Sequence, residues 1–171
     1  MSIRTLALAF LVSSVPTSGY PCSAVRRPSA NELVKDAEAI VLVRAEGLSG
    51  VKEFGTPTLA TTGTQVRFRI LEILKGEMPA ATIELTGTLT SADDRNDRPV
   101  PYDFVRPAGR HGNCYALEYR QSAEYVLLLK RQAGSLTPHW APLAPTNEQV
   151  FGATDPWLAW IRKAVAQLPK R

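Results

Sequence analysis

The sequence contains few of the residues from which metal, redox and nucleophilic sites are built. Two cysteines and two histidines among 171 residues cannot supply the usual four-ligand spacing of a zinc site. The G-x-S-x-G turn of hydrolases, the P-loop and the glycine fingerprint of dinucleotide-binding folds are all missing. Because a nucleophile, a base and oxyanion donors cannot be assembled, we expect a protein that is not an enzyme and has no cofactor.

Two short patterns contain the residue types of reactive sites without the rest of the site. His111 lies three residues before Cys114 in a glycine-containing loop, a separation that does not orient a base toward a thiol. The acidic run from Asp93 to Asp97 lacks the glycine and the distal glutamate of a calcium loop, and it contains Arg95. We therefore expect neither a catalytic site nor a metal site in these segments.

Charge and hydropathy argue against two classes of partner. The net charge is only +4, and basic and acidic residues are mixed along the chain without a long basic block, so we expect no nucleic-acid partner. The chain also has no apolar run of the ~20 residues that a membrane-spanning helix needs. We expect no transmembrane segment in the mature chain.

The N-terminal segment is typical of a secretory signal peptide. Arg4 gives it a positive start, a short apolar run follows, and the small residues Thr17 and Gly19 suit the −3 and −1 positions of a cleavage site. We predict that residues 1–19 are removed. The remaining residues 20–171 have the length of one domain, which we expect to be periplasmic or secreted.

Each end of this domain carries a helix signal. Ser29 and Glu32 have the spacing of a capping box and predict a short helix over residues 30–37. Asp155 is followed by proline, a pair that suits an N-cap and a first helical position, and predicts a helix over residues 156–168. The apolar face of this last helix can pack on the rest of the domain or bind a partner or a membrane surface.

Strand patterns occupy the middle of the chain. Residues 39–43 and 125–129 are continuous apolar runs typical of buried strands. We expect Gly47 to end the first of these strands. Residues 48–63, rich in threonine and glycine, predict a loop.

The next strand pattern changes phase. Val66, Phe68 and Ile70 alternate with polar residues, and the alternation then slips by one position. A β-bulge at this point would return Leu71 and Ile73 to the buried side and would bend the strand. Such a bend favours a sheet that curls toward a barrel.

Further strands complete a barrel pattern. Residues 82–87 alternate after a turn at Gly76, and residues 136–141 form an edge strand because Pro138 cannot donate to a sheet. Residues 115–119 fit either a strand or one helical turn. We predict a mostly-β domain: an OB-like, five-stranded closed barrel with a short N-terminal helix and a C-terminal helix.

Several of these motifs together resemble a known family. They are Cys22 before a short helix, the strand at 39–43, Val66-x-Phe-x-Ile with Leu-Lys-Gly76 after it, and Cys114 followed by Glu124-Tyr-Val-Leu-Leu-Leu-Lys130. This order resembles the netrin-like barrel of tissue inhibitors of metalloproteinases, and it is also similar to exported bacterial proteins of unknown function. The resemblance implies the barrel and a disulfide between Cys22 and Cys114, which an oxidising compartment permits.

In those inhibitors the first cysteine is the mature N-terminus, and its amine chelates the zinc ion of the target protease. Here the predicted mature end lies two residues before Cys22, and position 24 is alanine where the inhibitors have another cysteine. Inhibition of an extracellular or periplasmic protease, through a loop near Cys22, is therefore our second functional hypothesis.

The first hypothesis is a non-catalytic binding module for an unknown protein or small ligand in the periplasm or outside the cell. Its candidate surface lies at residues 99–113 of a long polar connection that spans 90–113, because this stretch holds aromatic and arginine residues of the kind enriched at binding hot spots. Two of them, Tyr102 and Phe104, could instead pack in a small apolar cluster under the loop. The candidate residues are Tyr102, Phe104, Arg106, Arg110 and His111.

Overall fold

The elements of the fold are taken from a computed structural model, which describes residues 26–54, 61–110, 114–132 and 134–169. The predicted signal peptide lies outside these residues. In chain order the elements are α1 (Ala30–Asp36), β1 (Ala39–Phe54), β2 (Thr61–Lys75), β3 (Thr82–Thr86), β4 (Thr88–Thr90), the 3-10 helix η2 (Pro107–Arg110), β5 (Glu118–Arg120), β6 (Glu124–Gln132), β7 (Ser135–Pro138), β8 (Asn147–Val150) and α2 (Pro156–Ala166).

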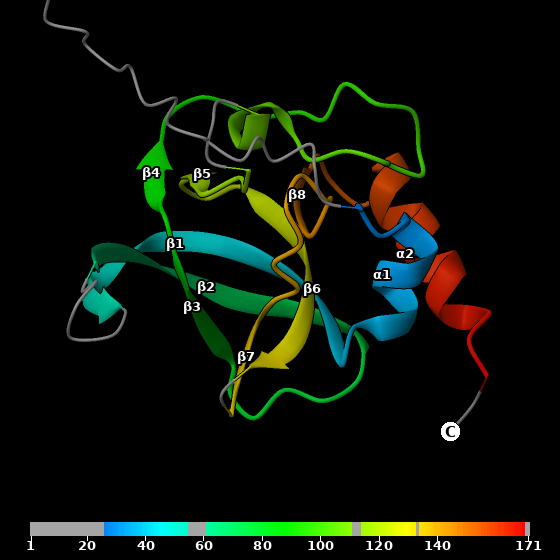
Figure 1. Cartoon of the computed structure of the whole chain (residues 1–171), viewed down its shortest axis with the longest axis horizontal. Helices are drawn as coiled ribbons and strands as arrows, with labels where there is room; N and C mark the ends of the chain where they lie inside the picture. The colour runs from blue at the N-terminus through cyan, green and yellow to red at the C-terminus, as the bar shows by residue number, and fades with distance from the viewer. Residues whose placement is uncertain (1–25, 55–60, 111–113, 133, 170–171) are drawn as a thin grey trace, which may run out of the picture.

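Both helices begin where their caps predict. The hydroxyl of Ser29 accepts a hydrogen bond from the backbone N–H of Glu32, whose carboxylate accepts one from the Ser29 N–H in return. The carboxylate of Asp155 accepts from the first two N–H groups after Pro156. Both helices lie side by side against the same side of the sheet (Figure 1). The apolar face of α2 is buried against this side of the sheet.

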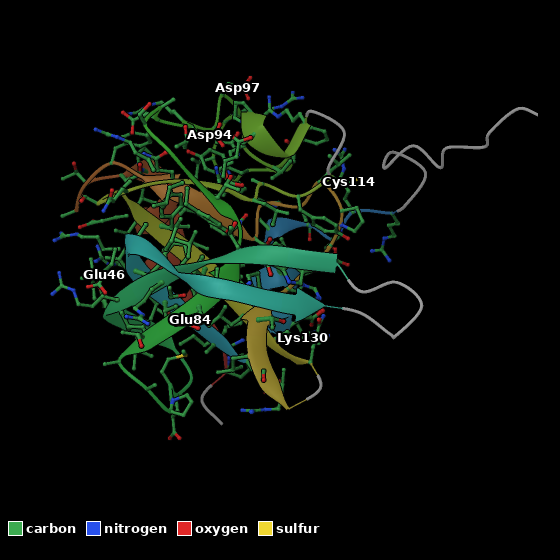
Figure 2. The ribbon with its side chains drawn as sticks, turned by 90° about the vertical axis from the view of Figure 1, so that its left-hand side faces the viewer. Glu46, Glu84, Asp94, Asp97, Cys114 and Lys130 are labelled. Carbon is green, nitrogen blue, oxygen red and sulfur yellow. The ribbon has the colours of Figure 1, made fainter. Side chains whose placement is uncertain are left out.

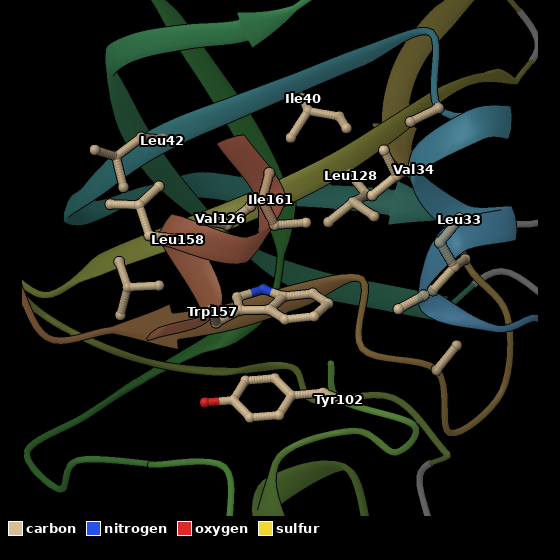
Figure 3. Close-up of a cluster of buried hydrophobic side chains, with 14 residues drawn as sticks. Leu33, Val34, Ile40, Leu42, Tyr102, Val126, Leu128, Trp157, Leu158 and Ile161 are labelled. Atoms are coloured by element: carbon tan, nitrogen blue, oxygen red, sulfur yellow. The ribbon is translucent and has the colours of Figure 1, made fainter. Parts of the chain in front are cut away.

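The main sheet is antiparallel, with the strand order β3-β2-β1-β6-β7 and with β8 paired to β6 beside β7. Successive side chains of β1 enter different cores. Ile40 and Leu42 pack with α1, α2 and Trp157 (Figure 3), whereas Val41 and Val43 pack on the opposite face around Phe68. Because both faces are buried, β1 and β6 read as continuous apolar runs, as the sequence indicates.

The prediction of a closed barrel is wrong. β3 pairs with only the five residues Gln65–Arg69 of β2, and the chain then leaves this sheet to form β4. β4 pairs in parallel with β5 as a separate two-stranded sheet. Within the described ranges no pairing joins β3 to β7, so the sheet curls without closing and the fold is an open, mostly-β sheet with two helices.

The first two strands are longer than predicted. β1 continues through Gly47 to Phe54, and β2 begins at Thr61, so the loop predicted over 48–63 is mostly a two-stranded ribbon. Leu48 pairs with Val66 and Gly50 with Gln65, and a register shift at Gly47 absorbs the glycine without ending the strand. Cross-strand pairing here overrides the weak strand propensity of the segment.

The bulge in β2 is in its predicted place, but its predicted effect is wrong. The register shifts between the pairs Leu42–Glu72 and Val43–Ile70, which leaves Leu71 as the extra residue. Leu71 and Ile73 nevertheless remain 37% and 48% exposed. A second shift follows between the pairs Val41–Ile73 and Ile40–Lys75, so this end of β2 is irregular on both sides of Ile73.

The predicted turn at Gly76 is confirmed by its backbone. Gly76 has φ of 72°, and a Cβ placed there would lie 2.1 Å from the carbonyl oxygen of Glu38. Pro138 ends β7 at an edge of the sheet, as predicted, and residues 118–120 resolve the other ambiguity as the short strand β5.

Candidate functional site

The long connection between β4 and β5 crosses one end of the sheet (Figure 1) and is anchored by a buried polar network. Figure 2 shows Asp94 and Asp97 of this connection at the same end as Cys114, away from Glu46 and Glu84 on the strands. The connection has an inner side, which faces the network, and an outer side, which faces solvent. These two sides hold different members of the predicted surface.

On the inner side the centre of the network is Arg106, whose side chain is completely buried. Its Nε donates to the carbonyl of Asn147 at 3.0 Å and its Nη2 to the carbonyl of Ala116 at 3.1 Å, while Nη1 forms an ion pair with Asp94. Each guanidinium nitrogen therefore has an acceptor, which is what permits a buried arginine. Arg106 does not contribute to an exposed surface, contrary to the sequence-based expectation.

The second buried charge is the carboxylate of Glu148 on β8. Its Oε1 accepts from the backbone N–H of Arg106 at 3.1 Å, and its Oε2 accepts from Nδ2 of Asn96 at 2.7 Å. Burial raises the pKa of Glu148 to about 7, although the Arg106 charge and these hydrogen bonds oppose the rise. The same Asn96 amide donates to the carbonyl of Phe104 at 2.8 Å, so Asn96 joins the interior to the outer side.

β8 contributes all three of its polar side chains to the network, and sequence reasoning missed this strand. Asn147 donates to the Tyr119 hydroxyl at 2.8 Å, and Gln149 accepts from the backbone N–H of Asp94 at 2.8 Å. All four residues of β8 are buried, yet three of them are polar. No hydropathy pattern marks such a strand, because its polar side chains bond to segments that are distant in sequence, although the buried Oδ1 of Asn147 has no hydrogen-bond partner.

Tyr102 also belongs to the interior. It is 7% exposed and its ring stacks on Trp157 with a centroid separation of 4.7 Å (Figure 3). Burial raises the pKa of Tyr102 to about 12. The alternative that Tyr102 packs under the loop is therefore the one that the structure supports, and Tyr102 is not available to a ligand.

The outer side gathers arginines around Phe104, which is partly buried because it also packs, as the alternative prediction has it, against the small apolar cluster of Val105, Ala116 and Leu143 under the connection. The guanidinium carbons of Arg27, Arg98 and Arg110 lie 4.4, 5.4 and 5.2 Å from the centre of its ring. Arg27 and Arg98 are exposed, and sequence reasoning missed both. We call these four residues the arginine–phenylalanine cluster; its members come from the N-terminal stretch and from the connection, so only folding brings them together.

Arg110 is the member of the cluster that the protein holds most firmly. Its Nη1 and Nη2 donate to the two carboxylate oxygens of Asp97 at 2.9 and 2.6 Å, and its Nε donates to the carbonyl of Val105 at 2.8 Å. These hydrogen bonds from Arg110 are the main reason why the pKa of Asp97 lies below its usual range. The two hydrogen bonds to one carboxylate fix the plane of the guanidinium beside Phe104.

The remaining predicted site residues are His111 and the two cysteines. His111 and Cys22 lie outside the described residues, so the Cys22–Cys114 disulfide stays a prediction. Cys114 has φ of 63° and packs in a small apolar cluster with Val105 and Leu143 under the connection. This position is compatible with a bridge that would tether the chain entry to the connection.

A separate hollow of about 300 Å³ lies near the end of β3. It is lined by Thr86, Tyr115, Leu117 and Trp140, and the rings of Tyr115 and Trp140 meet edge to face at 5.5 Å. The hollow is open and apolar. It can offer contact area to an apolar group, but these four side chains place no charged group to orient one.

Comparison with known proteins does not indicate a function for this chain. No protein-family model matches the chain, and neither a curated protein nor a solved structure is significantly similar to it. Within the described part of the chain, no three potential metal ligands are clustered. In the same part, no helix has the length and apolar character to cross a bilayer.

Proposed function

We propose that the protein is an exported, non-catalytic binding module that contacts its partner with the outer side of the connection. The observation that carries the proposal is the arginine–phenylalanine cluster on a base that is anchored in the interior. Asn96 bonds both to Glu148 and to the Phe104 carbonyl, which holds the backbone of the surface in one geometry. A surface ordered in advance loses less conformational entropy on binding than a mobile loop.

Export and partner binding are tested together on the mature protein. We expect the secreted form to begin after Gly19, as read by N-terminal sequencing, and to retain a partner from an envelope extract of the organism that makes it. The double variant Arg98→Gln, Phe104→Ala should lose that partner while its melting temperature falls by only about 2–4 °C. Equal recovery with both proteins would contradict the proposal, since the partner would then contact another surface.

Protease inhibition, the second hypothesis, would depend on the segment around Cys22, which lies outside the described residues. It stays a prediction. Adding the mature protein to a zinc endopeptidase and measuring the initial rate of peptide hydrolysis tests it, with a Cys22→Ser variant as the control. An unchanged rate at micromolar protein would remove this hypothesis.

A further inference from the structure

The arginine–phenylalanine cluster has an excess of positive charge with unused hydrogen-bond donors. Its three guanidinium carbons all lie within 5.4 Å of one ring centre. Asp97 balances Arg110 by a two-pronged ion pair and attracts Arg98 at longer range, whereas among the described residues neither Arg27 nor Arg98 forms an ion pair of its own or a side-chain hydrogen bond. Two planar cations are thus left with N–H groups that no acceptor in this part of the protein occupies.

Contact with an aromatic ring suits these cations to binding carboxylates. A guanidinium that rests on a ring face keeps the N–H groups of its edge available, and the fork of these groups matches the two oxygens of a carboxylate. The cation–π contact also reduces the freedom that an exposed arginine must lose on binding. Phe104 packs against the apolar cluster under the connection but is not fully buried, so part of its side chain stays accessible to an apolar neighbour.

The surroundings of the cluster favour the carboxylates of a peptide over the phosphates of a nucleic acid. Asp97 and Asp103 are exposed in the same connection and interrupt the positive surface that a long nucleic-acid backbone would need. Sparse arginines around an aromatic side chain are instead the composition of a protein-binding hot spot. This surface does not present the continuous basic groove that tracks a nucleic-acid backbone.

From this geometry we infer that the arginine–phenylalanine cluster binds an acidic segment of a protein partner, with carboxylates on Arg27 and Arg98 and an apolar side chain on Phe104. The inference rests on the proposed function and names the chemistry of the partner. Arg110 does not bind the partner directly. It is paired with Asp97, packs beside the Phe104 ring and adds to the positive electrostatic potential of the cluster.

The probe for the carboxylate part is a fluorescent decaglutamate peptide, with decaglutamine as the uncharged reference. We expect the mature protein to bind decaglutamate measurably more tightly than decaglutamine, with an affinity that falls as salt rises. The double variant Arg27→Gln, Arg98→Gln should weaken binding about tenfold, because each bidentate charge-assisted contact contributes more than an ordinary hydrogen bond.

A matched control separates the site from general charge. Arg67 and Arg131 are exposed arginines on β2 and β6, paired with Glu84 and Glu38, and Arg67→Gln, Arg131→Gln removes the same charge elsewhere. We expect it to change the affinity by less than about threefold. An equal loss in both double variants would overturn the inference, and so would failure of the wild-type protein to prefer decaglutamate.

Two further experiments test the role of Phe104 and the competing possibility of a small-oxyanion ligand. Phe104→Ala should weaken a peptide of alternating glutamate and leucine about fivefold while affecting decaglutamate less, since only the first peptide offers an apolar side chain. Inorganic pyrophosphate should not displace the peptide at comparable concentration. Displacement by pyrophosphate would overturn the peptide assignment in favour of a small-oxyanion site.

The outcomes also separate this inference from the proposed function. If the partner from the extract is lost with the Arg98→Gln, Phe104→Ala variant but decaglutamate does not bind, the acidic class is wrong and the binding surface stands. If the extract partner is retained by both proteins and decaglutamate does not bind either, both ideas fall. Circular dichroism melts of every variant confirm that the fold is intact.

Discussion

Both sides of the connection between β4 and β5 contain an arginine, but the inner arginine is part of the buried network and the outer one is part of the surface. Arg106 and Arg110 are four residues apart, yet Arg106 is completely buried among carbonyl and carboxylate acceptors, whereas Arg110 lies half-buried between Asp97 and Phe104. The inner arginine holds the chain in place because each of its three guanidinium nitrogens has an acceptor inside the protein. On the outer side, the guanidinium N–H groups of Arg27 and Arg98 remain available to a partner. An arginine in a polar loop thus predicts function only once its acceptors are known.

The difference between the two sides should appear first in stability. Arg106→Gln removes the charge that faces Asp94 and leaves Glu148 buried without its cation, so we expect the free energy of unfolding to fall by about 3–5 kcal/mol. Arg110→Gln should cost under about 1 kcal/mol, because its ion pair is exposed. Urea denaturation measures both. Similar losses for the two variants would break the comparison.

The two aromatic residues of the connection should differ in the same direction. Tyr102→Ala removes a ring stacked on Trp157 and should cost about 3 kcal/mol, whereas Phe104→Ala should cost about 1 kcal/mol. Tyr102→Phe keeps the ring and serves as the control. If Phe104→Ala proved the more destabilising of the two in thermal melts and urea titrations, Phe104 would belong to the core and not to the binding surface.

The buried carboxylate predicts a pH dependence. Burial raises the pKa of Glu148 from 4.5 to about 7, so between these values the folded state binds a proton that the unfolded state has released. Stability should therefore fall as the pH rises, by about 2 kcal/mol between about pH 5.5 and about pH 7.5. Glu148→Gln should flatten this slope. Denaturant titrations at the two pH values test it, and an unchanged slope in the variant would assign the effect to another group.

The charged groups that face Glu148 define what else could shape this slope. Arg106 lowers its pKa and Asp94 raises it, and both belong to the connection. Asp97, on the outer side, changes stability with pH in the opposite direction and in a lower pH range. The pKa of Asp97 is lowered by hydrogen bonds from Arg110, so its contribution is present above its ordinary pKa of 3.8 and is lost as the pH falls further.

The smallest expected effect is on the outer side alone. Asp97→Asn releases Arg110 from its ion pair and removes a negative charge beside the cluster. We expect the melting temperature to change little, and the affinity for decaglutamate to rise about two- to threefold because a repelling charge is gone. Fluorescence anisotropy at low and high salt checks this. A weaker affinity would mean that Asp97 is needed to position Arg110 for the ligand.

Local patterns predicted the parts of the fold that local physics controls. The capping residues before α1 and α2, the buried strand at 125–129 and the edge position of Pro138 all follow from side chains and backbone donors of the segment itself. The length of β1 beyond Gly47 and the existence of β8 do not. Both depend on pairing with a strand elsewhere in the chain, and the pattern of a short segment does not show which strand will pair with it.

The candidate site divides in the same way. Composition indicated the connection as the place of the surface; Arg110 and Phe104 lie toward its outer side, and Phe104 also packs against the apolar cluster beneath it. It could not separate them from Tyr102 and Arg106, because alternate burial along an irregular segment has no period. Nor could it add Arg27, which is far from the connection in sequence and meets the Phe104 ring only in the folded chain.

By itself the sequence determined which segments become helices and central strands, because caps and apolar runs act within a few residues. Only the tertiary structure decided that the sheet stays open and that a polar strand is buried. It also decided which arginines of the connection are interior and which remain outside. Each of these depends on whether a donor or an apolar face finds a partner from a distant segment, and that is settled when the whole chain packs.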